Sequence, residues 1–175
     1  MVLLLRYSGL RIGDALSLSR DRFAGGKLFL YTAKTGTVVW CPLPDAVIHA
    51  LEAVRGTNAK YFFWTGQGKL KSAIGDWQRS LSKLFALANV PCGHAHRFRH
   101  TFAVELLLAG VRIERVSVLL GHSSTRITEK HYSAWVRARQ EQLEADVRRS
   151  WELESIPDFS QAGSTATFGS AKFVL

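Results

Sequence analysis

The sequence predicts a mostly helical α+β domain with one small antiparallel sheet. Apolar residues recur at helical spacing along most of the chain, which is typical of amphipathic helices. Between about residues 27 and 41, two stretches instead alternate apolar and polar side chains around the turn residues Lys34-Thr35-Gly36. This pattern indicates a β-hairpin. With 175 residues, 47% of them hydrophobic, the chain is long and apolar enough to bury one core.

In the first third of the chain we expect short elements. Residues 2–7 are predicted to form a helix that breaks at Ser8-Gly9, and residues 11–18 form a second helix. The hairpin follows, and Pro42 ends its second strand. Asp45 is the expected N-cap of a helix that runs to about residue 55.

Longer helices are predicted in the rest of the chain. Residues 72–88 form an amphipathic helix, with apolar side chains such as Trp77, Leu81 and Leu84 at helical spacing. Residues 98–109 form the next helix and end at Gly110, an expected left-handed C-cap residue. The last two helices are expected over 113–120 and from 125 to about 149.

We assign residues 1–154 to a single domain. Residues 155–175 are rich in Ser, Gly, Thr and Ala and lack periodicity, so we expect a flexible tail. Because the chain starts inside a predicted helix, we expect that a preceding segment is missing. Cys41 and Cys92 form neither a disulfide framework nor a metal-ligand pair, which favours a reducing, cytoplasmic location. No apolar run is long enough for a membrane helix.

The chain is strongly basic, with a formal net charge of +9 and a pI near 10.0. Clustered Lys and Arg side chains attract polyanions, so this positive charge indicates a nucleic-acid partner. Charge alone does not distinguish nucleic acid from other acidic partners.

One group of residues points to phosphodiester chemistry. The run His96-Arg97-Phe98-Arg99-His100 is followed by Leu120-Gly121-His122 and then by Tyr132. Arginine binds two phosphate oxygens at once, histidine or lysine moves protons, and a tyrosine hydroxyl can act as the nucleophile. The residue pattern alone does not bring Arg11 and Lys34 close to Tyr132.

Five segments resemble the tyrosine recombinases, the phage integrase family, in their order and approximate spacing. They are Tyr7 to Asp14, Ala33 to Gly36, His96 to Phe102, Leu120 to Ser124 and Thr128 to Tyr132. The resemblance as a whole covers roughly residues 1–145. The resemblance implies the fold of a tyrosine recombinase catalytic domain and the function of a site-specific DNA recombinase or integrase.

The resemblance also implies a role for each matching residue. The expected catalytic residues are Arg11 and Arg99 as the two arginines, Lys34 as the hairpin lysine that protonates the leaving 5′-oxygen, His96 and His122 as the two histidines, and Tyr132 as the nucleophile. The implied reaction passes through a 3′-phosphotyrosyl intermediate, is resolved by a partner 5′-hydroxyl, and needs no metal or nucleotide cofactor.

The implied partners are double-stranded DNA and further copies of the chain on DNA, which form a tetrameric synapse in this family, with no membrane involved. The expected location is the cytoplasm, in association with the nucleoid. Family members usually carry an N-terminal DNA-clamping domain, which we expect to be absent here. The helix over residues 139–151 either packs on its own domain or docks on a neighbouring protomer.

Some assignments have alternatives within the sequence. His94 and Arg97 repeat the His-x-x-Arg spacing, although Arg99-His100-Thr101-Phe102 matches the family's helix start and favours His96 and Arg99. Asp14 either orients an arginine or is a surface acid, and His100 is expected to be a hydrogen-bonded structural residue. The six histidines show no zinc-binding pattern.

Three rival functions remain. The chain could be a non-catalytic, DNA-binding remnant of an integrase. It could be a type IB topoisomerase, which shares the residue types but not usually this spacing. A helix-turn-helix regulator over residues 98–120 would need a polar second helix, and Val116, Leu119 and Leu120 argue against it.

Overall fold

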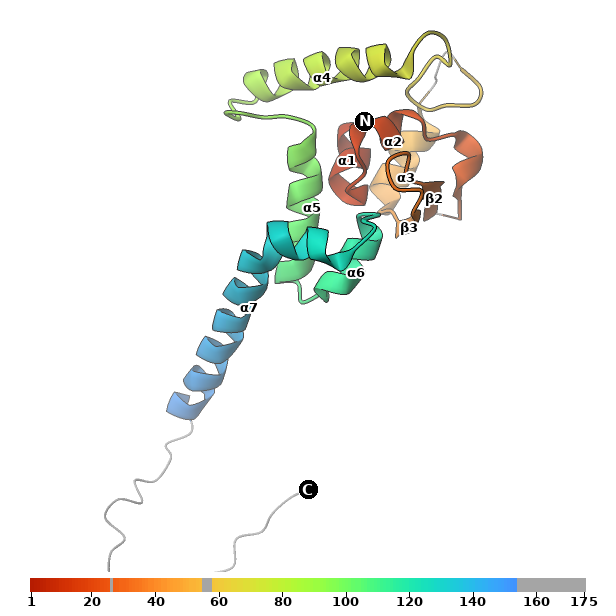
Figure 1. Ribbon diagram of the computed structural model, residues 1–175. Helices are drawn as coiled ribbons and strands as arrows, with labels where there is room; N and C mark the ends of the chain where they lie inside the picture. Colours follow the sequence, from red (N-terminus) through yellow and green to blue (C-terminus); the bar gives the residue numbers. More distant parts are fainter. Residues whose placement is uncertain (26, 55–57, 154–175) are drawn as a thin grey trace, which may run out of the picture. The chain divides into compact units, whose positions relative to one another are not determined.

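The computed structural model describes residues 1–25, 27–54 and 58–153, so the predicted tail 155–175 lies outside the described residues. Two compact units are distinguished, Met1–Arg139 and Gln140–Leu175. The elements in chain order are α1 (Val2–Ser8), α2 (Ile12–Leu16), the 3₁₀ helix η1 (Arg20–Arg22), β1 (Phe23–Ala24), β2 (Lys27–Tyr31), β3 (Val38–Pro42), α3 (Asp45–Glu52), α4 (Leu70–Leu87), α5 (His96–Leu108), α6 (Ile113–Leu119) and α7 (Thr125–Leu153), as shown in Figure 1.

The prediction of a mostly helical domain with a small antiparallel sheet is confirmed. The hairpin has the expected position, and Phe29 pairs with Trp40 across β2 and β3. A third strand, β1, extends the sheet in the order β1-β2-β3. The sequence did not predict β1 because two residues are too few for an alternating pattern to appear.

The main core lies under the sheet and among the first helices. Along β3, Val39 and Cys41 are buried, whereas Val38, Trp40 and Pro42 point outward. The inward side chains join apolar residues from α1, α2, α3 and α4, namely Leu4, Leu5, Ala15, Val47, Leu51 and Leu81. Helix α1 also packs on α5, and an ion pair between Arg6 and Glu105 joins these two helices.

A second, smaller cluster joins α5, α6 and the first part of α7. Its buried members are Ala103 and Leu107 of α5, Val116 of α6, Leu120, and Tyr132 of α7. These side chains come from three helices that follow one another in the chain. The cluster therefore fixes the part of α7 that carries Tyr132.

Several predicted helix boundaries need correction. The N-cap of α3 is Pro44, and Asp45 is the first helical residue. Helix α5 begins at His96, two residues earlier than expected, after a loop in which Cys92 has a positive φ of 54°. Helix α4 is amphipathic as predicted but contacts mainly α2, so only Leu81 is buried and Leu87 is 82% exposed.

Two glycines allow close approaches that position the site. Gly9 ends α1 with φ of 62°, and a Cβ there would lie 2.4 Å from the Phe102 ring. Gly121 has φ of 61°, and its Cβ would lie 2.5 Å from Thr32 Cγ2 in the hairpin. Gly110 has φ of 86°, which confirms the predicted left-handed residue after α5. Within the described ranges, no helix is long and apolar enough to cross a membrane.

Candidate active site

Arg99 lies at the centre of the candidate site. It is buried on α5, one turn after the first residue of that helix. Its Nη1 donates to the Gly9 carbonyl oxygen at 2.7 Å, and its Nη2 donates to the Leu120 carbonyl oxygen at 2.5 Å. Burial lowers the pKa of the guanidinium to about 10, and the nearby charge of Arg11 acts in the same direction. Arg99 therefore stays charged at neutral pH and joins the end of α1 to the end of α6.

His122 connects Arg99 to α7. Its Nε2 lies 2.9 Å from Arg99 Nη2, and its Nδ1 lies 2.8 Å from Thr128 Oγ1. Because a guanidinium only donates, Nε2 is the acceptor and Nδ1 carries the proton that is donated to Thr128. Burial first, and then the charge of Arg99, lower the pKa of His122 to about 4. His122 is therefore neutral at physiological pH.

Arg11 and Asp14 form a second part of the site. Arg11 immediately precedes α2, and its Nη1 lies 3.9 Å from Asp14 Oδ2. Both of these atoms are buried and lack a hydrogen-bond partner among the described residues. The other oxygen of Asp14 accepts a hydrogen bond from the Ala33 amide at 2.9 Å. Asp14 thus holds the hairpin turn, and Arg11 keeps a buried donor that an anion could use.

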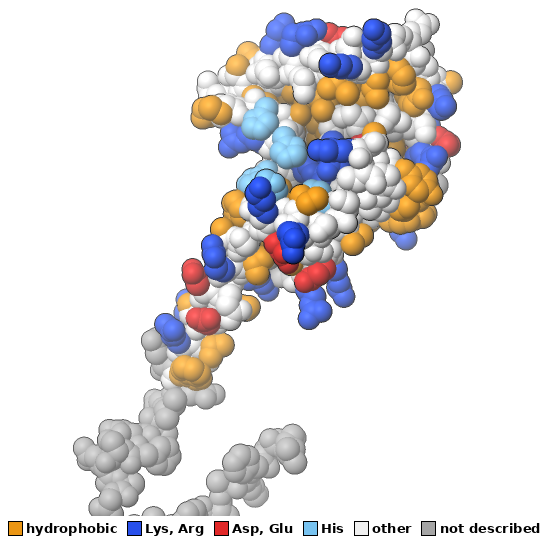
Figure 2. All heavy atoms as spheres, viewed as in Figure 1, with side chains coloured by type: hydrophobic (Ala, Val, Ile, Leu, Met, Phe, Trp, Pro, Cys, Tyr) orange, Lys and Arg blue, Asp and Glu red, His pale blue; other side chains and the backbone are white. Residues whose placement is uncertain are grey.

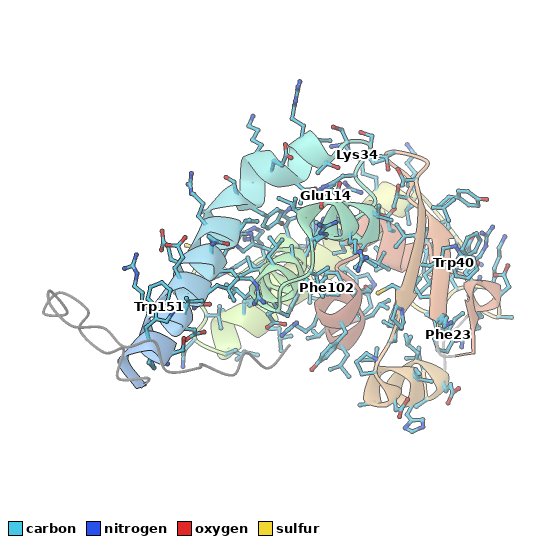
Figure 3. All side chains as sticks on the ribbon, turned by 90° about the horizontal axis from the view of Figure 1, so that it is seen from below. Phe23, Lys34, Trp40, Phe102, Glu114 and Trp151 are labelled. Atoms are coloured by element: carbon cyan, nitrogen blue, oxygen red, sulfur yellow. The ribbon has the colours of Figure 1, made fainter. Side chains whose placement is uncertain are left out.

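The turn between β2 and β3 brings Lys34 towards this region. Ala33 is held by Asp14, and Thr35 Oγ1 donates to the Gly121 carbonyl oxygen at 2.9 Å. Lys34 lies between these two anchors, and its side chain is exposed at the tip of the hairpin, as Figure 3 shows. The backbone of the turn is therefore fixed next to the segment that carries His122, while the lysine side chain remains free to move.

His96 is the first residue of α5 and is exposed. Together with Arg11, His94 and the α4 residue Gln78 it lines a cavity of about 450 Å³. Burial and then the charge of Arg99 lower the pKa of His96. In Figure 2, histidine side chains gather beside Lys and Arg side chains along one hollowed side of the molecule.

Tyr132 lies beside the site with its ring packed in the second core cluster. Only 4% of the residue is exposed. The centroid of its ring lies 5.4 Å from that of His100 and 5.9 Å from that of Trp135. Burial raises the pKa of the Tyr132 phenol, and the charge of Arg99 partly opposes this. The described conformation therefore holds the phenol near Arg99 but protonated and largely shielded from solvent.

The two His-x-x-Arg registers differ in the surroundings of their residues. Arg97 is exposed and donates to the Pro91 carbonyl oxygen at 2.8 Å, and His94 Nδ1 lies 2.9 Å from the Cys92 carbonyl oxygen. Both residues interact locally with the loop that precedes α5. Arg99, not Arg97, lies at the centre of the site.

Two residues of the site were not singled out from the sequence. Thr128 is fully buried and bonds His122, and Thr35 holds the hairpin turn. Thr128 lies one helical turn before Tyr132, so the spacing of four residues could have indicated a shared helix face. The ring of His100, which was expected to be hydrogen-bonded, packs against the rings of Tyr132 and Trp135.

The polar groups of the site are those of an anion-binding and proton-transferring centre. Two arginines, two histidines and a phenol lie close enough to influence one another's ionisation. In the described part of the chain, no group of three or more His, Cys, Asp or Glu side chains could hold a metal ion.

The fold is that of tyrosine recombinase catalytic domains. The model of the phage integrase family matches residues 1–138, and the chain belongs to this family. The resemblance drawn from the five sequence segments is therefore confirmed.

Individual relatives agree with this assignment. A tyrosine recombinase XerC from Rhizobium meliloti (strain 1021) is 34% identical over 138 residues, which cover 73% of this chain and 43% of that protein. The chain spans less than half the length of the curated relatives that it matches first.

Solved structures show a similar fold at low sequence identity. The crystal structure of XerA recombinase superposes with a TM-score of 0.64 at 19% identity, covering 83% of this chain and 56% of that one. The integrase of the transposon Tn1549, in complex with circular intermediate DNA, gives a TM-score of 0.59 at 20% identity, with 81% and 58% covered.

Proposed function

We propose that this chain is the catalytic domain of a site-specific DNA recombinase or integrase. It would cleave and rejoin DNA strands through a 3′-phosphotyrosyl intermediate. The observation that carries the proposal is the hydrogen-bonded chain Arg99–His122–Thr128, together with the buried Nη1 of Arg11 that has no hydrogen-bond partner among the described residues. Its partners would be duplex DNA and further copies of the chain assembled on DNA, in the cytoplasm and in association with the nucleoid.

The two arginines would stabilise the negative charge that builds up on the phosphate. A guanidinium has five N–H donors, and Arg99 uses three of them within the protein. Its Nε and one hydrogen of Nη1 remain for phosphate oxygens, as does the unpartnered Nη1 of Arg11. Fixed donors of this kind stabilise a transition state more than they stabilise the ground state.

The two histidines and Lys34 would complete the proton transfers. In neutral His122 the Nε2 lone pair accepts a hydrogen bond from Arg99, so Nε2 can take up a proton only when this hydrogen bond is released. His96 faces the same site from the rim of the cavity that it shares with Arg11. Lys34, on an anchored turn, would protonate the leaving 5′-oxygen.

Tyr132 would attack the phosphorus. In the described conformation the phenol is shielded, so attack requires the start of α7 to shift and expose the hydroxyl. Closer contact with the two guanidiniums would lower the pKa of the phenol and favour the nucleophilic phenolate. DNA binding would promote this shift. A phosphate bound between Arg11 and Arg99 would compete with the contact of Arg11 to Asp14 and with the hydrogen bond of Arg99 to His122.

The direct test is incubation with nicked or suicide duplexes, followed by denaturing electrophoresis. We expect a covalent protein–DNA adduct that Tyr132→Phe abolishes and that Tyr7→Phe, a change at an exposed tyrosine, leaves intact. Lys34→Ala should slow adduct formation without altering the fold, because its side chain is exposed. Adduct that persists in Tyr132→Phe would refute the nucleophile assignment.

The second candidate is a DNA-binding remnant without catalysis. The burial of Tyr132 is the observation in its favour, because a nucleophile locked in the core cannot attack. The same experiment distinguishes the two functions. A duplex that binds at low salt but never becomes covalently attached would identify the remnant.

A further inference from the structure

The outward face of the β2–β3 hairpin is aromatic and open. Phe29 pairs with Trp40, and Tyr31 with Val38, across the two strands. The ring centroids of Phe29 and Trp40 lie 4.3 Å apart, and those of Phe29 and Tyr31 lie 5.5 Å apart. Trp40 is 61% exposed and Tyr31 is 57% exposed. Exposed apolar patches of this kind mark binding surfaces, and none of these rings belongs to the candidate active site.

Positively charged side chains lie close to these aromatic rings. The guanidinium of Arg22 lies 5.4 Å from the Phe29 centroid and 5.8 Å from that of Tyr31. Lys27 begins β2 on the same outward face, paired with Pro42. Neither strand contains an acidic residue. The face therefore combines ring surfaces with positive charge.

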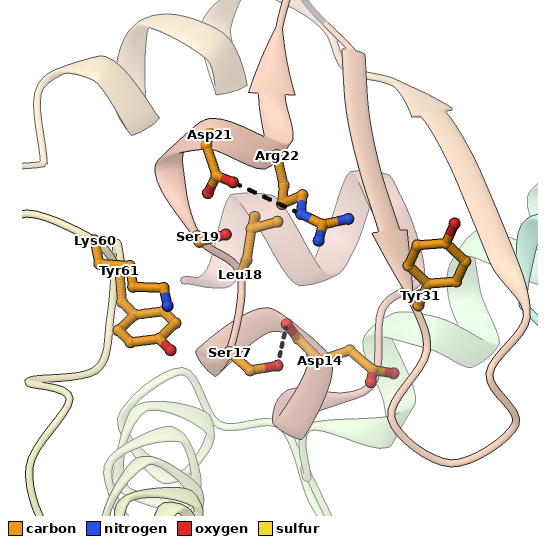
Figure 4. A pocket seen from close by; sticks show the side chains of 9 residues that line it. All are labelled: Asp14, Ser17, Leu18, Ser19, Asp21, Arg22, Tyr31, Lys60 and Tyr61. Atoms are coloured by element: carbon orange, nitrogen blue, oxygen red, sulfur yellow. Dashed lines mark hydrogen bonds and ion pairs between the residues drawn. The ribbon is translucent and has the colours of Figure 1, made fainter.

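A pocket continues this face beyond Arg22. Arg22 and Tyr31 line a cavity of about 300 Å³, whose opposite wall contains Lys60 and Tyr61 (Figure 4). The Lys60 ammonium lies 5.4 Å from the centre of the Tyr61 ring. The pocket thus adds another cation and another ring to the same surface.

Two carboxylates also line the pocket. Asp14 is buried, and one of its oxygens bonds the Ala33 amide. Asp21 is exposed at the rim, 3.8 Å from Arg22 Nε. Because Asp14 is buried, the negative charge of Asp21 is the one that would repel an anionic ligand at the mouth of the pocket.

We propose that this face and its pocket bind single-stranded nucleic acid. Unpaired bases stack on Trp40 and Tyr31, and phosphates lie against Arg22 and Lys60. Exposed rings on the outer face of an antiparallel sheet, with cations nearby, suit splayed bases and their backbone. An apolar protein partner would not use the interleaved cations. The proposal extends the proposed function, because none of the six residues assigned to cleavage lines this face or its pocket, although Asp14 lines the pocket and also holds the hairpin turn.

The test measures binding of a short labelled oligothymidylate by fluorescence anisotropy, in a Tyr132→Phe background that prevents covalent attachment. Trp40→Ala should weaken binding about tenfold, the size expected for the loss of one stacked base. Trp40→Phe should keep most of the affinity, because it retains an aromatic ring. Trp40→Leu should reduce the affinity as much as Trp40→Ala does, because neither leucine nor alanine can stack on a base. Asp21→Asn should tighten binding because it removes a negative charge. Trp151→Ala, at a tryptophan that is also exposed, is the matched control and should bind as the parent does.

Three results would overturn the proposal. One is that the parent protein does not bind the oligonucleotide. Another is that Trp40→Leu binds as tightly as the parent, which would exclude stacking. The third is that Trp40→Ala changes the molecular mass seen by light scattering but not the oligonucleotide affinity, which would make the face a protein interface. Duplex cleavage, measured without the Tyr132→Phe change, should be retained in Trp40→Ala, so the two proposals can fail separately.

Discussion

Arg99 is both a structural residue and a candidate catalytic residue. Its guanidinium satisfies the carbonyl oxygens of Gly9 and Leu120, which are separated from it by 90 and 21 positions in the sequence. A buried carbonyl that loses its donor is destabilised, so the arginine helps to hold the fold. The two N–H groups of Arg99 that these contacts leave over, on Nε and Nη1, are the donors that we propose for the phosphate.

Arg99→Ala should therefore impair stability and activity together. Loss of two buried hydrogen bonds is expected to lower the free energy of unfolding by about 3 kcal/mol. The removal of one charge-stabilising donor should slow adduct formation about a hundredfold. Urea unfolding and single-turnover cleavage measure the two effects. Arg97→Ala, at the exposed arginine of the alternative register, should change the free energy of unfolding by less than about 1 kcal/mol. Equal losses in the two variants would contradict this account.

His122 should make stability depend on pH. Its pKa is about 4 in the folded protein, whereas a histidine in the unfolded chain has a pKa near 6.5. Between these values the unfolded chain binds a proton that the folded protein does not bind, so stability falls as the pH is lowered from about 6.5 to about 4. Since the ring is partly accessible to solvent, we expect a loss of about 1–2 kcal/mol. The lowered pKa of His96 adds in the same direction.

Urea unfolding at several pH values tests this expectation. His122→Gln should flatten the dependence, because an amide does not titrate. His49→Gln, at an exposed histidine of α3, should retain the slope of the parent protein. A slope that is unchanged by His122→Gln would assign the effect to other groups.

Among the elements, the β2–β3 hairpin depends on contacts at both ends. Its turn is held by Asp14 and by the Gly121 backbone, and its second strand packs inward through Val39. Gly121 is positioned so that Thr32 and Val39 fill the space where a side chain would be. The close approach of the hairpin to the α6–α7 connection therefore requires glycine.

Two glycines have similar φ angles but differ in how close their neighbours are. Alanine substitutions at the two positions therefore distinguish the cost of backbone strain from the cost of steric crowding. Gly121 has φ of 61° and a Cβ position 2.5 Å from Thr32 Cγ2, whereas Gly36 has φ of 64° and no atom within 4 Å. Gly36→Ala should cost about 1 kcal/mol of the free energy of unfolding, from the left-handed backbone alone. Gly121→Ala should cost about 3 kcal/mol, because crowding is added. Thermal or urea unfolding measures the difference, and equal costs would contradict the close packing.

For the molecule as a whole, the division into two units suggests where the chain can be shortened. The second unit begins at Gln140, within α7, and its apolar residues Leu143, Val147 and Trp151 are 45%, 48% and 55% exposed. These residues contribute little to burial where they are described. They are available for contact with another protomer in the assembly on DNA that we propose.

Deletion of the residues after Gln142 should therefore change the free energy of unfolding by less than about 1 kcal/mol. Assembly on duplex DNA should be impaired more than folding. Native gels with labelled duplex, together with urea unfolding, compare the two properties. Leu87→Ser removes an exposed apolar side chain from α4 and should leave assembly unchanged. Unchanged assembly after the deletion would place the C-terminal helix on its own domain.

The helices and the hairpin could be predicted from short stretches of sequence, and the six candidate site residues, which stay a prediction, were named from such stretches as well. Their signals are periodicity, turn residues and family segments, which extend over a few neighbouring positions. The chosen register, with His96 and Arg99, came from such a segment, and the structure places Arg99 in the buried centre. The two-residue strand β1 and the exposure of α4 were missed, because neither has a local signal of sufficient length.

The sequence by itself thus determined the family, the main elements and the residue types available for phosphodiester chemistry. Folding alone decided that Tyr132 is packed in a core cluster, that Thr128 and Thr35 hold the site, and that an aromatic face stays open. These outcomes depend on pairs such as Thr35 with Gly121, which are 86 positions apart. Whether a side chain is buried depends on which distant surfaces meet, and a local pattern carries no information about that.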